Sequence, residues 1–230
     1  MKLERPADGR SCEHATGVLG MTGVTASGQQ TAAAIRREAA ASFVKHGYEA
    51  TSLRNIAAAV GIKVGSLYNH ITSKEDLLLS VMGGTMDDLN ALMEEALDGP
   101  TDPVDRLIAF VECHIRFHAE RAQEVFIGNT ELRSLRDDAR AELSQKRREY
   151  RKLLEELIVR VGEAGEADIL NARLHAFSIV AIGTHVAGWY REDGGLPLDE
   201  IIEIYTTMVL RSLSVENADT RVSEHLATLG

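Results

Sequence analysis

The segment KVGSLYNH (63–70) holds the residues of this 230-residue chain that are best suited to a chemical task, because it displays short polar side chains along one short helix. Such side chains reach base edges when a helix lies in the major groove of DNA. Two short helices joined by VGIK (60–63), behind a longer supporting helix, would present the segment as a helix-turn-helix. Gly61 suits the sharp turn because glycine adopts left-handed backbone angles at little steric cost. Ala57 leaves room for the second helix to cross closely, so the pattern indicates a DNA-binding unit.

A second group with chemical potential is the pair His114 and His118. On a helix this spacing puts both imidazoles on one face, where they could bind one metal ion. Cys113 points about 100° away from that face, and no third carboxylate or thiol completes a ligand set. We therefore expect core histidines or hydrogen-bonding groups of a pocket, with no metal and no cofactor. The sequence has no recognisable Ser-His-Asp spacing, glycine-rich phosphate loop or paired-carboxylate motif, which argues against an enzyme.

The segment 63–70 and the two histidines are expected to lie on helices, because apolar residues recur at steps of three and four. No stretch alternates between apolar and polar residues for long enough to form a strand. Aromatic residues make up only 5% of the chain and prolines number 4, which also favours helices over a β-sandwich. The sequence predicts an all-α fold of about nine helices. They span approximately 31–47, 51–61, 64–70, 73–97, 103–118, 123–132, 137–163, 177–190 and 198–213.

Charge is distributed unevenly along the chain, whose formal net charge is -10. Residues 27–82 hold six Lys and Arg against four Asp and Glu, whereas residues 83–230 hold 16 against 28. Only the N-terminal part could therefore approach a polyanion such as DNA without a repulsive surface.

Features of the whole chain predict a cytoplasmic protein. The only cysteines are Cys12 and Cys113, so a disulfide framework is not expected. Residues 1–20 lack the apolar core of a secretory signal. The longest uncharged run, 174–190, is shorter than the ~20 apolar residues that a membrane span needs, so no membrane partner is expected.

Residues 47–78, GYEATSLRNIAAAVGIKVGSLYNHITSKEDLL, resemble the DNA-binding domain of TetR-family transcriptional repressors. The chain departs from the family pattern at Ile71, where the family has an aromatic residue. This departure concerns packing between the recognition helix and the following helix more than contact with DNA. The matching positions are Gly47, Tyr48, Thr51, Ile56, Ala57, Gly61, Leu67, Tyr68, His70, Ser73, Lys74 and Glu75.

The resemblance implies a DNA-binding role for individual residues. Thr51 or Ser52, Tyr68 and Lys74 would meet phosphates, and Leu67 belongs to the core. Tyr68 could instead be a packed core aromatic. The residues expected nearest the bases are Arg54, Lys63, Gly65, Ser66 and Asn69, and His70 belongs to the same DNA-binding surface. For Arg54 and Lys63 the alternative is that each is an ordinary solvent-exposed charge with no contact to DNA.

The resemblance also divides the chain into parts. It implies a homodimeric, ligand-responsive repressor that binds palindromic operator DNA. We expect a disordered arm (1–29), a three-helix DNA-binding domain (30–78), a helical ligand-binding and dimerisation domain (79–215) and a flexible C-terminal tail (216–230).

Three further segments, 114–135, 146–158 and 188–201, are similar to family members that sense acyl-CoA thioesters, including intermediates of lipid or steroid breakdown. The effector is thus expected to be a hydrophobic small molecule. Arg147 and Arg148 could meet CoA phosphates, although a solvated helix face is the favoured interpretation. Nine residues are expected to line a tunnel for the effector: Met86, Phe110, His114, Phe117, His118, Phe126, Tyr150, Phe177 and Trp189. For each of them the alternative is an ordinary place in the hydrophobic core of the helix bundle.

The last two predicted helices are the expected dimer contact. Residues 177–190 are apolar on nearly every face, and 198–213 carry a clean apolar stripe, so one face can meet a partner subunit. Two other functional classes stay open. A helical metal-binding enzyme would depend on His114 and His118, and a helical adaptor without DNA binding would depend on the net charge of -10.

Overall fold

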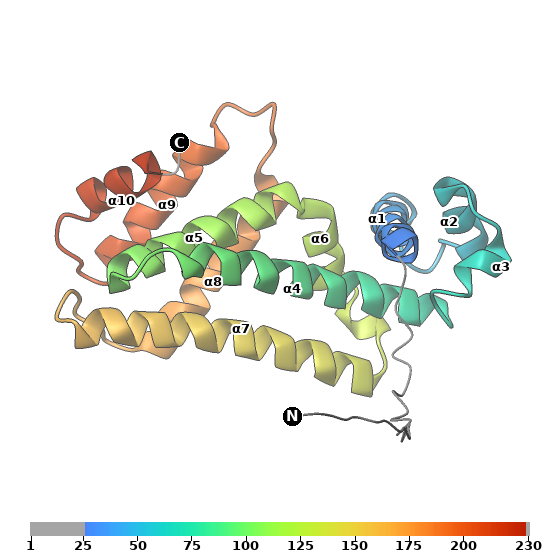
Figure 1. The fold of residues 1–230 in the computed structure, drawn as a ribbon, viewed down its shortest axis with the longest axis horizontal. Helices are drawn as coiled ribbons and strands as arrows, with labels where there is room; N and C mark the ends of the chain where they lie inside the picture. The colour runs from blue at the N-terminus through green and yellow to red at the C-terminus, as the bar shows by residue number, and fades with distance from the viewer. Residues whose placement is uncertain (1–25, 229–230) are drawn as a thin grey trace, which may run out of the picture.

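The computed structural model describes residues 26–228, and within that range the chain is all-helical, with helices α1 to α10 and one 3₁₀ turn (Figure 1). The predicted fold class is therefore confirmed. Most of the predicted arm, residues 1–25, lies outside the described residues. Helix α1 begins at Ala26, four residues before the predicted domain boundary at residue 30.

The N-terminal domain forms one end of the molecule (Figure 1). Its helices are α1 (Ala26–His46), α2 (Leu53–Val60) and α3 (Val64–Leu67). They enclose a small core that also receives the first turns of α4 (Lys74–Asp98). The largest buried side chains of this core include Ile35, Phe43, Ile56, Leu67, Leu77 and Leu78.

Local capping explains why α2 is short. The hydroxyl of Ser52 accepts a hydrogen bond from the backbone N–H of Asn55 at the start of α2. Gly61 ends α2 with φ of 78°, a left-handed conformation that favours glycine. Helix α3 is shorter than predicted, because residues 68–70 form a turn rather than a further helical turn. Ile71 is buried in this domain's core, in keeping with the packing role expected of it.

Helix α4 connects the two domains as one continuous helix. Its start is fixed by reciprocal capping, in which the Ser73 hydroxyl accepts from the N–H of Asp76 and the Asp76 carboxylate accepts from the N–H of Thr72. At 25 residues, α4 is about 37 Å long at 1.5 Å per residue. Its N-terminal half belongs to the first core, and Leu89 and Met93 belong to the core of the second domain.

The C-terminal domain is built around α5 (Pro103–Glu120). This helix is buried on most of its surface because α4, α8 (Ala172–Trp189), α7 (Asp137–Glu163) and α9 (Leu198–Ser212) all pack against it. Helix α6 (Ala122–Thr130) and the 3₁₀ turn η1 (Leu132–Ser134) join α5 to α7. None of the helices within residues 26–228 combines the length and apolar character required to cross a bilayer.

Gly183 allows α8 to approach α5 closely. A Cβ atom at this position would lie 2.3 Å from Cδ2 of His114, which is far inside van der Waals contact. The small residues of α8 therefore serve packing within one protomer, at least at this position. Gly183 is buried, so it is not available to bring a second subunit close to α8.

The prediction of a flexible tail over 216–230 is wrong, because residues 218–227 form helix α10 (Ala218–Ala227). Ala218 and Val222 are buried against α9 and α5. Two polar contacts add to this packing, the ion pair of Arg211 with Asp219 and the hydrogen bond from Ser223 to Glu203. This additional helix also explains why the structure has more helices than the predicted nine.

Candidate functional site

The surface around α3 presents the polar side chains expected to meet DNA. Lys63, Ser66, Asn69 and His70 are all exposed, and Arg54 is exposed on the neighbouring α2. Gly65 faces open space, because a Cβ built there meets no atom within 4 Å. An exposed glycine on this face permits close approach of a duplex.

Tyr68 is 53% exposed, so the alternative of a packed core aromatic is wrong for this residue. Leu67, by contrast, is fully buried, as predicted. The exposed phenol stands at the end of α3, beside the side chains named above. Its hydroxyl is therefore available as a hydrogen-bond partner.

Thr51 is buried, and its hydroxyl donates within the protein. The acceptors are the backbone carbonyls of Gly47, at 2.8 Å, and Ser42, at 3.2 Å. We therefore remove Thr51 from the expected phosphate contacts. The phosphate contact of Ser52 stays a prediction: its hydroxyl oxygen accepts the capping hydrogen bond, and its hydrogen is available to an acceptor such as a phosphate.

Lys74 is held in place rather than free in solvent. Its Nζ donates to the backbone carbonyl of Glu49 at 2.9 Å and lies 4.4 Å from the centroid of the Tyr48 ring. These contacts fix the start of α4 to the loop before α2. Lys74 thus ties the long helix to the DNA-binding domain.

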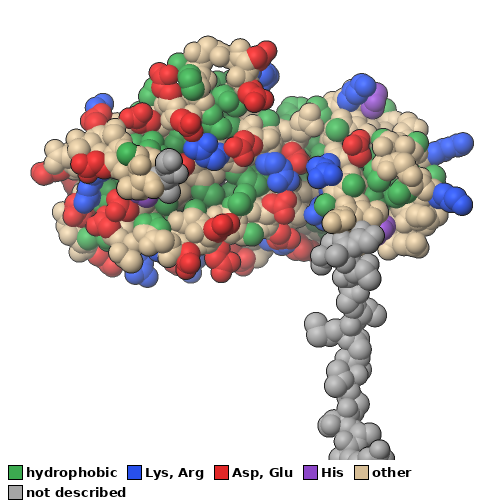
Figure 2. Space-filling view, turned by 45° about the horizontal axis from the view of Figure 1, so that its top comes forward, with side chains coloured by type: hydrophobic (Ala, Val, Ile, Leu, Met, Phe, Trp, Pro, Cys, Tyr) green, Lys and Arg blue, Asp and Glu red, His purple; other side chains and the backbone are tan. Residues whose placement is uncertain are grey.

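The surface charges separate along the molecule. In Figure 2, carboxylates are spread over the C-terminal domain, whereas Lys and Arg side chains project from the end formed by α1 to α3. This arrangement agrees with the uneven charge in the sequence. It gives DNA a face without repulsion at one end only.

The C-terminal domain contains a cavity of about 510 Å³ between α4, α5, α6, α7 and α8. Its inner wall is formed by buried side chains such as Met82, Leu89 and Val125, and exposed residues including Ala181 and Gly188 form its rim. Such a volume is in the usual range of small-molecule sites. Of the residues expected in a tunnel, those on the cavity wall are Met86, His114, Phe117, His118, Phe126, Tyr150 and Phe177.

Phe110 and Trp189 do not line the cavity, so their placement in the tunnel was wrong. Phe110 is fully buried behind the wall, with its ring 5.1 Å from that of Tyr150. Trp189 is 40% exposed and packs edge-on against Tyr205 of α9. A Phe or Trp on an apolar helix face can serve the core or a subunit surface equally well, and the sequence does not distinguish these roles.

A hydrogen-bonded cluster of four side chains forms the polar part of the wall. Nδ1 of His114 lies 2.9 Å from the Tyr150 hydroxyl, and its Nε2 lies 3.2 Å from the carbonyl of Val180. Nδ1 of His118 lies 2.7 Å from the carbonyl of His114. Thr184 completes the cluster, with its hydroxyl 3.3 Å from Nε2 of His118 and 3.5 Å from Nε2 of His114.

Burial keeps this cluster uncharged at neutral pH. The pKa of His118 is lowered to about 4, mainly because burial desolvates the imidazole; the hydrogen bond to the His114 carbonyl raises this pKa and the nearby Arg147 lowers it. Burial and the neighbouring His118 hold the pKa of His114 well below its ordinary value. Desolvation raises the pKa of Tyr150 well above its ordinary value.

The histidine pair does not form the core of a metal site in this arrangement. His114 uses both ring nitrogens in hydrogen bonds within the protein. Across residues 26–228, no three His, Cys, Asp or Glu side chains come together as metal ligands.

Two arginines line the cavity: Arg147, for which a solvated helix face was the favoured interpretation, and Arg151, which the sequence analysis did not single out. Arg147 donates to the carbonyl of Gly128 at 2.7 Å, and burial lowers its pKa. The guanidinium of Arg151 lies 4.1 Å from the centroid of the Phe177 ring. The sequence did contain a signal, because Arg147 falls in register with the apolar stripe of Leu143, Tyr150 and Leu154, where a solvated charge is not expected.

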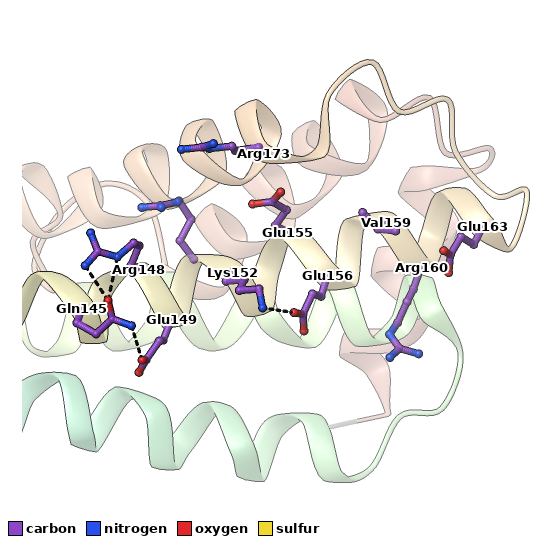
Figure 3. Close-up of a pocket in the computed structure, with 11 residues that line it drawn as sticks. Gln145, Arg148, Glu149, Lys152, Glu155, Glu156, Val159, Arg160, Glu163 and Arg173 are labelled. Carbon is purple, nitrogen blue, oxygen red and sulfur yellow. Dashed lines mark hydrogen bonds and ion pairs between the residues drawn. The ribbon is translucent and has the colours of Figure 1, made fainter.

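The face of α7 that carries Arg148 has the solvated character that was the favoured interpretation for Arg147 and Arg148. A shallow groove of about 590 Å³ there is lined mainly by charged side chains, some of which pair with a neighbour (Figure 3). Arg148 donates to Gln145, and Lys152 pairs with Glu156 at 3.4 Å. These satisfied, exposed charges make the groove a poor site for a hydrophobic effector, so the interpretation as a solvated face holds for Arg148 and fails for Arg147.

Comparison with known proteins identifies the family. The family model described as "Bacterial regulatory proteins, tetR family" matches residues 35–81, and that described as "Tetracyclin repressor-like, C-terminal domain" matches residues 100–213. The HTH-type transcriptional repressor KstR2 of Rhodococcus jostii (strain RHA1) is 32% identical over 183 residues, which are 76% of this chain and 87% of that protein. The chain belongs to the TetR family.

Solved structures agree with this assignment. AibR, in complex with isovaleryl coenzyme A and operator DNA, is 28% identical with a TM-score of 0.70, over 80% of this chain and 99% of that one. The ketosteroid transcriptional regulator KstR2 of Mycobacterium tuberculosis is 26% identical with a TM-score of 0.70, over 79% of this chain and 94% of that one. This TetR-family protein is thus a ligand-responsive, DNA-binding transcriptional repressor and not an enzyme.

The low pKa of His118 has a measurable consequence for the stability of this TetR-family repressor. The unfolded chain takes up a proton at this histidine near pH 6.5, whereas the folded protein resists it down to about pH 4. The stabilisation from neutral His118 is therefore complete above pH 6.5 and is lost as the pH falls toward 4. Replacing His118→Gln should reduce the loss of unfolding free energy between pH 7.5 and pH 5 by about 2 kcal/mol.

Denaturant unfolding at the two pH values checks this expectation. His185→Gln is the matched control, because His185 also lines the cavity but is exposed at its rim. An equal pH dependence in the parent protein and in His118→Gln would contradict a neutral, buried His118.

Proposed function

We propose that this TetR-family repressor binds a two-fold-symmetric operator as a homodimer and that a hydrophobic acyl-CoA thioester releases it from DNA. The observation that supports this proposal most directly is the shared helix α4. Its N-terminal turns belong to the DNA-binding core, and four of its residues, Met82, Thr85, Met86 and Leu89, line the cavity.

In this proposal α3 reads the operator. Lys63, Ser66 and Asn69 lie nearest the base edges, together with Arg54 from α2. Ser52 and Tyr68 contact phosphates, which fix the register of the domain on the duplex but carry no sequence information. Lys74 supports the same surface by holding the start of α4 in place.

Removing one cation from α3 should weaken DNA binding in a salt-dependent way. Lys63→Gln should lower operator affinity and reduce the slope of log affinity against log salt by about one if Lys63 meets a phosphate, or change base preference if it meets a base. Fluorescence anisotropy with operator DNA at several salt concentrations measures both effects. Lys152→Gln removes the same charge from the exposed face of α7 and should bind DNA as the parent does; equal behaviour of the two variants would overturn the placement of the recognition surface.

The dimer is proposed to form through the outer faces of α8 and α9. Apolar side chains are exposed on both helices, among them Leu174 and Ile182 on α8 and Ile204 and Met208 on α9. An exposed apolar surface of this kind is typical of a subunit interface. A two-fold dimer would place two α3 helices on successive turns of the major groove, about 34 Å apart.

Met208→Glu tests the proposed interface because Met208 is 53% exposed in the protomer, whereas Val209 is buried and a charge there would damage the protomer core. A glutamate at the centre of an apolar interface should cost about 3 kcal/mol or more and shift sedimentation toward monomer. Leu92→Glu on α4 is the control, since Leu92 is 47% exposed on another helix. A dimer that withstands Met208→Glu as well as Leu92→Glu would place the interface elsewhere.

Three features support an acyl-CoA effector: the apolar wall of the cavity, two arginines without ion pairs, and a similar protein with a bound acyl-CoA. Apolar side chains form most of the cavity wall, and Arg147 and Arg151 add positive charge to it. Neither arginine forms an ion pair within residues 26–228, and Nε of Arg151 is buried without a hydrogen-bond partner there. An amphiphile with an anionic end would satisfy these groups. The similar protein AibR has isovaleryl coenzyme A bound in one of its structures.

Release requires that the effector bind the DNA-free shape more tightly than the DNA-bound shape. A hundredfold release corresponds to a difference of about 3 kcal/mol between the two binding free energies. A ligand pressing on Met86 and its neighbours would move α4 and with it the spacing of the two α3 helices.

Acyl-CoAs of varied chain length should dissociate the operator complex of the parent protein at micromolar levels. Ala181→Phe narrows the rim of the cavity and should block this release while leaving DNA affinity unchanged. Ala91→Phe adds the same ring at an exposed position of α4 outside the cavity and should behave as the parent. If no acyl-CoA dissociates the complex and none raises the melting temperature, the effector assignment fails and the family assignment stands.

A further inference from the structure

We propose that the inner wall of the cavity selects an effector whose hydrocarbon part carries a hydroxyl group. This hydroxyl donates its hydrogen to Nε2 of His118 and accepts a hydrogen bond from Thr184. The inference rests on the proposed function in one respect, because it assumes that the effector occupies this cavity.

The protein partners of the two histidines fix which nitrogens carry hydrogen. Nδ1 of His118 lies 2.7 Å from the carbonyl oxygen of His114, and a carbonyl only accepts, so this nitrogen is the donor. A neutral imidazole carries one N–H, which leaves Nε2 of His118 with a lone pair. Likewise, Nε2 of His114 donates to the carbonyl of Val180, and its Nδ1 accepts from the hydroxyl of Tyr150.

His118 belongs to the cavity wall, and its Nε2 is therefore a hydrogen-bond acceptor that the protein satisfies with one long contact. Its one partner within residues 26–228 is the hydroxyl of Thr184, at 3.3 Å, which is longer than a typical hydrogen bond from a hydroxyl. A ligand hydroxyl can replace this contact. Thr184 then turns its own hydrogen toward the oxygen of the ligand, and both groups are satisfied.

Other neutral groups satisfy this pair less well. A ketone accepts from Thr184 but leaves the lone pair of His118 without a donor in a buried site, which is costly. A methyl group uses neither partner. The hydroxyl is the simplest group that both donates and accepts at one oxygen.

A carboxylate is also excluded from this position. The lone pairs of the carboxylate oxygens would face the lone pair of Nε2 of His118 and be repelled by it. Protonation of His118 would relieve this repulsion, but the burial of the imidazole and the positive charge of Arg147 both oppose protonation. The anionic end of an amphiphile therefore stays away from His118. The chemical class that fits is an acyl thioester with a hydroxyl on the chain or ring remote from the thioester.

Matched probes test the selection on the full-length protein. Isothermal titration calorimetry would compare octanoyl-CoA, 7-oxooctanoyl-CoA and 7-hydroxyoctanoyl-CoA, with cyclohexanol, cyclohexanone and methylcyclohexane as probes without CoA. The hydroxyl probe of each set should bind roughly tenfold more tightly than its ketone, as expected for one additional buried hydrogen bond.

Variants assign the preference to the named atoms. His118→Phe should abolish the preference for hydroxyl over ketone, whereas His185→Phe at the rim should retain it. Thr184→Val, which keeps the shape of the side chain and removes the hydroxyl, should reduce the preference and guards against a folding defect in His118→Phe.

Each outcome separates this inference from the proposed function. Thioester binding without a hydroxyl preference, or with a preference that persists in both His118→Phe and Thr184→Val, overturns the inference and leaves the acyl-CoA proposal intact. Failure of all thioesters together with His118-dependent binding of cyclohexanol overturns the acyl-CoA proposal and supports the inference. Failure of every probe overturns both.

Discussion

The membership of α4 in two hydrophobic cores is the constraint on which the rest of this structure depends. Leu77, Leu78 and Met82 are buried with α1 to α3, and Leu89 and Met93 are buried with α5 and its neighbours. The first core also receives Ile127 of α6 and Leu143 of α7, so the DNA-binding domain rests directly on two helices that line the cavity. Because close-packed interiors transmit strain, this shared packing is what the proposed release from DNA would use.

The close packing of α8 on α5 places polar chemistry inside an otherwise apolar domain. Gly183 lets the two backbones approach until His114 touches α8, and the ring nitrogens of His114 then find partners on α7 and α8. A buried polar group is tolerated only when it is hydrogen-bonded, and the cluster meets this condition while remaining neutral. The packing of α8 on α5 thus both stabilises the fold and places the polar cluster of His114, His118, Tyr150 and Thr184 in the cavity wall.

The excess of acidic side chains lies in the larger domain, and this distribution agrees with the two tasks of the molecule. The DNA-binding end must come close to phosphates, and the acidic surface of the larger domain would be repelled by them. Arg147 and Arg151 differ from the ion-paired cations of that domain, because both line the cavity and neither forms an ion pair within residues 26–228. Their neighbours Arg148 and Lys152, on the other face of α7, have polar or acidic partners and stay in water.

The sequence by itself determined the fold class, the helix-turn-helix and the identity of its turn, because these depend on local periodicity, capping and the left-handed conformation at Gly61. It also determined that Leu67 and Ile71 are buried and, through the resemblance of residues 47–78, pointed to the family. Only the tertiary structure decided which aromatic residues face the cavity: Phe110, Phe177 and Trp189 have the same local character and end in the core, on the cavity wall and on the surface.

The remaining differences have the same physical origin. Thr51 and Ser52 are chemically alike, and their separate roles depend on whether α1 covers the hydroxyl. Residues 216–230 lacked a long apolar pattern, yet Ala218 and Val222 become buried because α9 and α5 offer a surface to receive them. The sequence specifies what a residue can do, and the neighbours brought by tertiary packing decide which of these possibilities is realised, because burial and hydrogen-bond partners come from segments far away in the chain.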